Sequence, residues 1–171
     1  MKIFKEIMSY VAIVLVVILI RIFVVTPVKV DGTSMVSTLH DNDILLLKKF
    51  DKSIERFDVI VFPYKKDRLV KRVIGLPGDR IKISVTHVGN KVASKIYING
   101  EVLEEDYGVE DMSDAGIAAN ELTLGSDEYF VLGDNRNHSL DSRVIGVVKK
   151  KDISGITNFR LFPIKDFGKF E

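Results

Sequence analysis

The chain has 171 residues, with 25 basic and 24 acidic residues and a formal charge of +1. This length suits one domain with its own core plus a short additional segment, and the near balance of charge argues against nucleic acid as a partner, because nucleic-acid-binding domains usually carry a basic excess on one face. The absence of cysteine excludes disulfides, thiolate metal sites and cysteine nucleophiles.

The first predicted element is an apolar helix over residues 7–25. Its length would be about 28 Å, close to the hydrocarbon thickness of a bilayer, and Arg21 lies near enough to one end for its side chain to reach the interface. A buried soluble helix is disfavoured because apolar residues cover every face. A cleaved secretory signal is the serious alternative, since Lys2 and Lys5 precede the run, but the run continues past Arg21 and no small-x-small site follows. We therefore predict a permanent anchor that ends at Thr26 and Pro27.

The basic residues around the predicted anchor indicate its orientation. Lys2 and Lys5 flank one end and Lys29 alone lies close after the other, which mildly favours a cytoplasmic N-terminus. The predicted organisation is residues 1–6 in the cytoplasm, residues 7–25 as a single pass through the plasma membrane, and residues 26–171 as an extracellular domain.

Short strands are predicted after Pro27. Residues 81–85 alternate as a half-buried strand should, and Asn99-Gly100 between two apolar runs is a strong hairpin signal. The segment over residues 104–126 is acidic and rich in small residues, so we expect a loop or mobile insertion, with Glu104, Glu105 and Asp106 solvated. Further strands are predicted over residues 28–30, 43–50, 58–64, 68–76, 96–98, 101–103, 128–132 and 153–162. The domain is therefore mostly β, with residues 80–127 or so as a variable insertion and hairpin region.

Four segments stand out as unusual for a purely structural β domain. They read GTSMVSTL over residues 32–39, DVIVF over 58–62, KRVIGLPGD over 71–79 and GDNRNHSLDSR over 133–143. Each has an ordinary explanation when taken alone. Ser34 could be a turn hydroxyl, Lys71 a solvent-facing strand residue, LPGD a turn set by its proline and glycine, and the last segment a hydrogen-bonded loop.

Taken together, in this order and spacing, the four segments resemble the motifs of the type I signal peptidase family, in its compact Gram-positive form. The likeness runs from the predicted anchor to residues 155–163. It implies the LexA-like β-fold of that family and a membrane-bound serine endopeptidase. Such an enzyme removes signal peptides from exported pre-proteins after small-x-small (Ala-x-Ala) sites, so its partners would be signal peptides and membrane lipid.

The resemblance also assigns catalytic roles, with Ser34 as nucleophile and Lys71 as general base. A lysine in water is a poor base, but burial among apolar neighbours disfavours its charged form and lowers its pKa by several units. By the same resemblance the Ser139 hydroxyl orients Lys71, and the oxyanion hole combines the Ser34 N–H with a donor near Gly32.

Substrate binding is expected along extended backbone. A peptide can add as a strand beside residues 28–33 and residues 69–70, with small side chains filling shallow apolar pockets. By resemblance the pockets involve Val28, Val30, Met35, Leu39, Leu69 and Val70, for which simple core packing is an equally weighted alternative. Five charged residues are expected to form structural ion pairs: Arg72, Asp134, Arg136, Asp141 and Arg143. The three histidines lack metal-ligand spacing, so we expect no metal and no cofactor.

One residue departs from the family pattern Ser-Met-x-Pro-Thr, because Ser37 occupies the proline position. Loss of the fixed φ should loosen the turn and reduce or specialise activity. This leaves a second hypothesis, a weakly active or non-catalytic homologue that serves as a pilus or surface-protein assembly factor with pilin or sortase machinery as partner. A self-cleaving DNA-binding regulator is disfavoured by the anchor, and a histidine-dependent hydrolase by the lack of a triad context.

Overall fold

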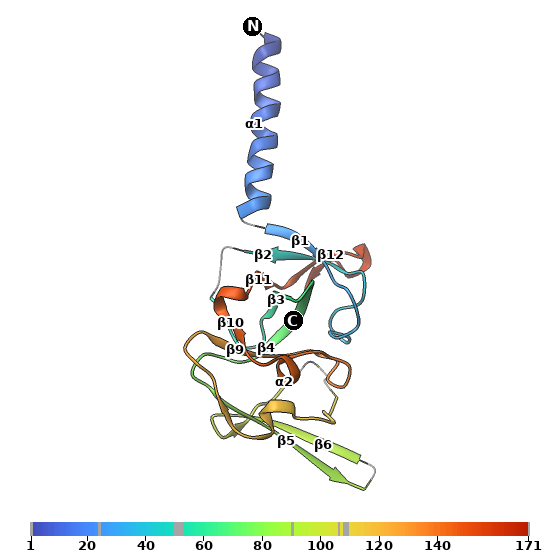
Figure 1. Cartoon of the computed structure of the whole chain (residues 1–171). Coiled ribbons are helices and arrows are strands. Elements are labelled where there is room, and N and C mark those ends of the chain that lie inside the picture. Colours follow the sequence, from blue (N-terminus) through green and yellow to red (C-terminus); the bar gives the residue numbers. More distant parts are fainter. Residues whose placement is uncertain are drawn as a thin grey trace.

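The computed structural model describes residues 2–23, 25–49, 53–89, 91–105, 107 and 110–170. A single long helix, α1 (Lys2–Phe23), extends away from a β body that holds the rest of the chain (Figure 1). The helix begins earlier than predicted, and Val25 belongs to strand β1 (Val25–Lys29) instead of the helix. The side chain of Arg21 lies outside the part of the chain that is described.

The apolar side chains described along α1 are exposed on all of its sides. They are Ile3, Phe4, Ile7, Met8, Tyr10, Val11, Ile13, Val14, Leu15, Val16, Val17 and Ile18. Nevertheless, within the described residues no helix satisfies both the length and the apolarity that a membrane crossing requires. The anchor over residues 7–25 and its orientation therefore stay predictions.

The β body is built on one large sheet. Among the described residues nine strands form it, in the order β10-β9-β4-β3-β11-β2-β12-β13, with β1 paired to β2 outside this path. The strand pairs are antiparallel. The bounds are β2 (Ile44–Lys48), β3 (Val59–Tyr64), β4 (Asp67–Gly75), β9 (Glu128–Leu132), β10 (Val148–Lys149), β11 (Gly155–Thr157), β12 (Phe159–Phe162) and β13 (Gly168–Lys169).

A smaller sheet stands at the end of the body far from α1 (Figure 1). Its order is β7-β6-β5-β8, with β5 (Arg80–Val88), β6 (Lys91–Ile98), β7 (Glu101–Val102) and β8 (Leu122–Thr123). The predicted hairpin turn is confirmed, since Asn99 and Gly100 have φ of 55° and 92° and join β6 to β7. The remaining elements are α2 (Ser142–Ile145) and three short 3₁₀ helices, η1 (Gly116–Ala119), η2 (Lys150–Asp152) and η3 (Ile164–Asp166).

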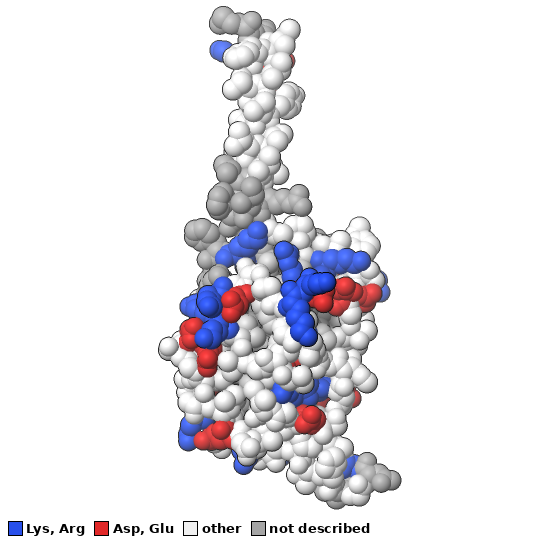
Figure 2. All heavy atoms as spheres, viewed as in Figure 1, with Lys and Arg blue, Asp and Glu red and all other residues white. Residues whose placement is uncertain are grey.

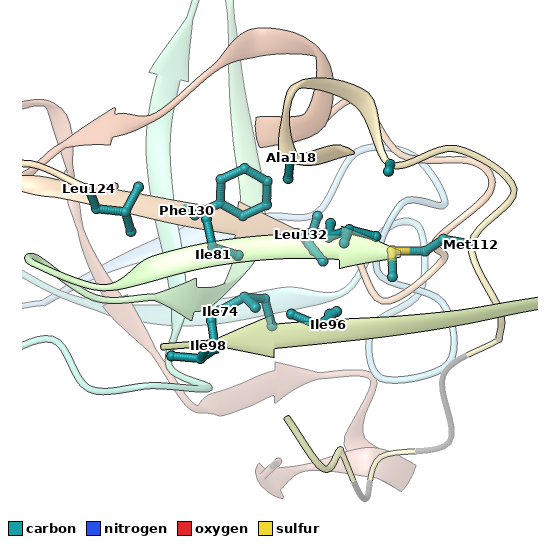
Figure 3. Close-up of a cluster of buried hydrophobic side chains, with 11 residues drawn as sticks. Ile74, Ile81, Ile96, Ile98, Met112, Ala118, Leu124, Phe130 and Leu132 are labelled. Atoms are coloured by element: carbon teal, nitrogen blue, oxygen red, sulfur yellow. The ribbon is translucent and has the colours of Figure 1, made fainter. Parts of the chain in front are cut away.

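Buried apolar side chains form separate clusters on the two faces of the large sheet and between the sheets. Val59 and Val61 of β3 face one cluster and Ile60 and Phe62 face another, as the alternation of a strand requires. A further cluster joins the two sheets, with Ile74, Phe130 and Leu132 of the large sheet meeting Ile81, Ile96 and Ile98 of the small one (Figure 3).

Three sequence predictions need correction. Residues 104–126 are not simply a loop, because they contain η1 and β8 and bury Met112 and Ala118 in the cluster between the sheets (Figure 3). Glu105 is not solvated but pairs with a buried arginine, whereas Asp106 lies outside the described residues. The strand predicted over residues 153–162 is divided into β11 and β12, which are separated by Asn158.

Candidate active site

Ser34 is the first residue of a tight turn. Hydrogen bonds at the base of its loop and buried side chains after it fix the position of this turn. The loop containing it is closed at its base by hydrogen bonds from Val30 N to Asp43 O (2.8 Å) and from Asn42 N to Val30 O (3.0 Å). After Ser34, a helical turn runs from Met35 to Leu39, whose N–H donates to Met35 O (2.8 Å). Both of these side chains are buried, so they anchor the turn and leave the Ser34 hydroxyl at its surface.

Lys71 reaches this serine from the middle of β4. Its side chain is only 1% exposed, and its Nζ lies 2.6 Å from Ser34 Oγ. The Nζ also donates to the carbonyl of Val70 (2.8 Å). Burial lowers the pKa of Lys71 from 10.5 to about 8, while the carboxylates of Asp141 and Asp134 act in the opposite direction. About a tenth of the amine is therefore neutral at pH 7, and this share, which can accept a proton, grows as the pH rises towards 8.

Both carboxylates near Lys71 carry their own arginine partner. Asp134 accepts from Arg72 Nε (3.0 Å) and Nη2 (2.7 Å), and Asp141 accepts from Arg143 Nε (2.9 Å) and Nη2 (2.8 Å). These bidentate pairs are buried, so the positive charge of each arginine offsets the pull of its carboxylate on the lysine proton.

Residues 133–143 also form hydrogen bonds directly with the turn over residues 34–39, which carries Ser34 and is called the nucleophile turn below. Thr38 Oγ1 donates to Asp134 (2.6 Å), and the Asn135 N–H donates to the carbonyl of Ser34 (3.1 Å). The Asn135 side-chain amide donates to the carbonyl of Thr33 (3.1 Å). The fifth predicted ion-pair residue, Arg136, donates to Gly133 O (3.1 Å) and to Glu105 (2.9 Å).

Neither Ser139 nor Gly32 forms a hydrogen bond with the catalytic pair among the described residues. Ser139 Oγ is buried beside Gly133 and has no hydrogen-bond partner among the described residues, so the expected bond to Lys71 is not formed there and its orienting role stays a prediction. Gly32 has a φ of +94° that suits glycine, and its N–H donates to Asp41 Oδ1 (2.8 Å). The sequence prediction combined the Ser34 N–H with a donor near Gly32, and the Ser34 N–H bonds to no acceptor in the described part of the chain.

The six predicted pocket residues divide between two buried clusters. Met35 and Leu39 are 1% and 0% exposed, so core packing, the alternative to a pocket role, accounts for both side chains in this structure. They share one cluster with Val28, Val30 and Val70, whereas Leu69 packs half-buried against another.

The first part of β4, the strand that carries Lys71, has an edge without a strand neighbour. In the described residues, β9 pairs only with the part of β4 from Arg72 onward, so residues 67–70 have no strand neighbour on the side opposite β3. The backbone groups of that edge are available to an added strand.

Some contributing residues had no role in the sequence predictions. Asn135 was visible in its motif, and its place beside aspartate and arginine was the available signal. No sequence pattern indicated a role for Asp41, Glu105 or Tyr107, because each contacts a residue that is distant in the sequence or belongs to another element.

Comparisons with known proteins identify the family of the chain. The family described as "Signal peptidase, peptidase S26" matches residues 3–162. Signal peptidase I of Bacillus caldolyticus is 38% identical, covering 90% of this chain and 88% of that protein, and signal peptidase I of Bacillus amyloliquefaciens is 35% identical, covering 89% and 84%. Signal peptidase IB of Staphylococcus aureus is 34% identical, covering 85% and 82%.

A crystal structure of a signal peptidase I from Enterococcus faecalis V583 is 36% identical, covers 61% of this chain and 97% of that chain, and has a TM-score of 0.48. The family match spans nearly the whole sequence, and the relatives exceed 30% identity over most of both chains. The chain therefore belongs to the signal peptidase family, peptidase S26, and is a serine peptidase of the type I signal peptidase group.

Proposed function

We propose that this peptidase removes signal peptides from exported pre-proteins with Ser34 as the nucleophile and Lys71 as the general base. The observation that carries the proposal is the 2.6 Å separation of Lys71 Nζ and Ser34 Oγ in a site where the lysine is buried. A hydroxyl at hydrogen-bond distance from a base whose pKa lies near 8 has the geometry for general-base catalysis, in which the proton moves as the oxygen attacks.

The proposed reaction uses Ser34 and Lys71 in each of its steps. Neutral Lys71 takes the Ser34 proton as Oγ attacks the scissile carbonyl, and the Ser34 N–H stabilises the negative oxygen that develops. The Lys71 ammonium then gives its proton to the departing amine as the peptide bond breaks. Water, deprotonated by the same lysine, attacks the acyl-serine, releases the signal peptide and restores the hydroxyl.

We propose that the substrate lies extended along residues 67–70 of β4 and residues 28–33. The unpaired edge of β4 supports this, because backbone hydrogen bonds can hold a strand there whatever its side chains. Small side chains at the first and third positions before the cut, as in Ala-x-Ala, suit shallow apolar surfaces from Val28, Val30, Leu69 and Val70. Met35 and Leu39 are buried in the same cluster as Val28, Val30 and Val70 and would form the floor of that surface, whereas Leu69 packs against another cluster.

We further propose that α1 anchors the protein in the plasma membrane as a single pass, with lipid as its partner. Its 22 residues would be about 33 Å long, and its described apolar side chains are exposed on every side. On the face that Figure 2 shows, lysine, arginine, aspartate and glutamate gather on the β body and leave most of α1 uncharged. Lys2 and Lys5 favour a cytoplasmic N-terminus, which leaves the catalytic body outside the cell.

Ser37 in place of proline favours a second candidate, an assembly factor that binds pilin or sortase machinery without cutting it. One experiment separates the two functions. The purified full chain and its Ser34→Ala variant are incubated with a precursor whose signal ends in Ala-x-Ala, and Ser37→Ala provides a matched control in the same turn.

Cleavage by the native chain and by Ser37→Ala, but not by Ser34→Ala, supports the peptidase with the proposed nucleophile. Cleavage by Ser34→Ala would overturn the role of Ser34. Equal inactivity of all three proteins, with binding of the precursor retained, would favour the assembly factor.

A further inference from the structure

Tyr107 lies between two buried arginines that support the active site. Its ring centroid is 4.1 Å from the guanidinium carbon of Arg72 and 6.0 Å from that of Arg136. Arg136 Nη2 donates to the Tyr107 hydroxyl (3.2 Å), and that hydroxyl donates to Glu105. Phe57 packs edge-on against the same ring, with 5.8 Å between centroids. One tyrosine from the insertion thus contacts both cations and a second aromatic ring.

Arg72, whose guanidinium lies against the Tyr107 ring, forms a hydrogen bond with the nucleophile turn. Arg72 binds Asp134 with two nitrogens, donates to the Phe57 carbonyl (3.1 Å) and donates to Thr38 Oγ1 (3.2 Å). Thr38 closes the arrangement by donating to Asp134. A shift of the Arg72 guanidinium would therefore change both the charge balance of Asp134 and the position of the turn that carries Ser34.

The charged groups around Lys71 show why this matters for the base. The segment over residues 133–143 supplies Asp134 and Asp141, which both favour the protonated lysine. Their partners are Arg72 from β4 and Arg143 from α2. The nucleophile turn contributes the uncharged Ser34 and Thr38. Behind Arg72, Glu105 and Arg136 form an ion pair of their own and cancel each other.

The ring of Tyr107 lies over the guanidinium of Arg72, whose Nε and Nη2 bond to Asp134. A tyrosine face attracts a guanidinium, and the attraction grows when both groups are removed from water. Burial, together with the neighbouring Glu105, raises the pKa of Tyr107 above its ordinary value, so the hydroxyl stays protonated over any assay range. The contact is therefore independent of pH between 6 and 10 or so.

We propose that Tyr107 is a positioning residue for the catalytic pair, because its ring holds Arg72 on Asp134 and so preserves the neutral Lys71 amine against Ser34. This inference rests on the proposed roles of Ser34 and Lys71. The proposal assigns a role in catalysis to a residue of the insertion, which carries no recognisable motif.

Two measurements on the detergent-solubilised full chain test the proposal. One follows the titration of Lys71 by NMR of ¹³C-labelled lysine, with Lys71→Met used to assign the signal. The other is kcat/KM for a signal-peptide substrate from pH 6 to 10. Tyr107→Leu removes the ring, Tyr107→Phe keeps the ring and removes the hydroxyl, and Tyr97→Leu is a matched control on β6 away from Arg72.

For Tyr107→Leu we expect the Lys71 titration and the acid limb of the rate profile to move up by about one pH unit, because Asp134 is less well neutralised. Activity would fall about tenfold at pH 7 and less than about twofold near pH 9.5. Tyr107→Phe should shift the limb much less, and Tyr97→Leu should not shift it.

A Lys71 titration that is the same in Tyr107→Leu and the native chain would overturn the proposal, as would a rate loss that is equal at every pH. If Tyr107→Leu does not fold, pentafluorophenylalanine at position 107 preserves the shape and reverses the charge distribution of the ring, and the same upward shift is expected. If the native chain cleaves no substrate, the proposed function fails, whereas the NMR titration still decides whether Tyr107 controls Lys71.

Discussion

Lys71 occupies a position where its charge is costly. The side chain is buried, and the fall of its pKa from 10.5 to about 8 corresponds to about 3 kcal/mol of free energy. The unfolded chain binds this proton up to the higher pKa and the folded chain only up to the lower one. Stability should therefore rise with pH between these values, and at neutral pH the protein retains a destabilising residue that packing alone does not explain.

The pH dependence of catalysis should report this lysine. Because only the neutral amine acts as a base, we expect kcat/KM to rise with pH through an apparent pKa near 8, with about a tenth of the maximal value at pH 7. A peptide substrate assayed between pH 6 and 10 gives the profile. An acid limb that lies near pH 6, or one close to 10, would show that Lys71 is not the base or that its burial is lost in solution.

Ser37 provides a second prediction for a single residue. Its N–H donates to no acceptor in the described part of the chain, and Ser37 is not among the residues with positive φ. Proline at this position would lose no hydrogen bond and would restrict the unfolded chain, so Ser37→Pro should stabilise the protein by about 0.4–1 kcal/mol. We expect kcat to rise because the turn holds Ser34 more firmly.

Thermal unfolding and precursor cleavage, measured side by side for Ser37→Pro and the native chain, check this expectation. Ser37→Ala controls for loss of the hydroxyl. A drop in either stability or kcat for the proline variant, with Ser37→Ala unchanged, would mean that the turn does not accept a proline-like φ.

At the scale of elements, the sequence predicted those parts that have local periodicity or a local turn signal. Residues 81–85 alternate because one side of β5 is buried, and Asn99-Gly100 adopts the positive φ that the hairpin requires. Residues 104–126 gave no such signal. Small residues such as Gly116 pack there through distant contacts, since a Cβ at Gly116 would lie 2.3 Å from the carbonyl of Arg143. Ser34 and Lys71 were predicted from motifs, whereas the contacts of Tyr107 with Arg72 and Arg136 depend on the tertiary fold and have no local sequence signal.

The segment over residues 133–143 depends on a close approach at its first residue. A Cβ at Gly133 would lie 2.2 Å from Ser139 Oγ and 2.5 Å from the carbonyl of Ser34, so this strand end and the nucleophile turn are in direct contact. Gly133→Ala should push the two apart, reduce kcat at least tenfold and destabilise the fold by about 1–3 kcal/mol.

Gly125→Ala is the matched control for that experiment. Its added Cβ would meet only the end of the flexible Glu128 side chain, at 3.0 Å, so both kcat and the unfolding midpoint should stay close to those of the native chain. Kinetics and thermal unfolding of both variants are compared in the same detergent. Native-like kcat in Gly133→Ala would show that the contact does not position Ser34.

The whole molecule separates an exposed apolar helix from a β body whose nucleophile turn follows closely behind that helix. Ser34 lies 11 residues beyond Phe23, the last residue of α1, and 11 residues of extended chain reach at most about 40 Å, so the catalytic pair stays within that distance of the helix end. If α1 is embedded in a bilayer, this arrangement brings the catalytic pair to the level at which a membrane-held signal peptide leaves the lipid.

Charges placed in the middle of α1 test that arrangement. Val14→Asp combined with Val17→Asp should release the protein from membranes, since each aspartate near the centre of a membrane helix costs about 2.5–3.5 kcal/mol. Ile164→Asp combined with Phe167→Asp alters two exposed apolar residues outside the helix and should leave the protein in the membrane fraction after an alkaline wash. The α1 variant should lose cleavage of a membrane-inserted precursor while it still cuts a short soluble Ala-x-Ala peptide, because its Ser34 and Lys71 are unaltered. Retention of the α1 variant in washed membranes, or equal loss of both activities, would contradict the anchoring role of the helix.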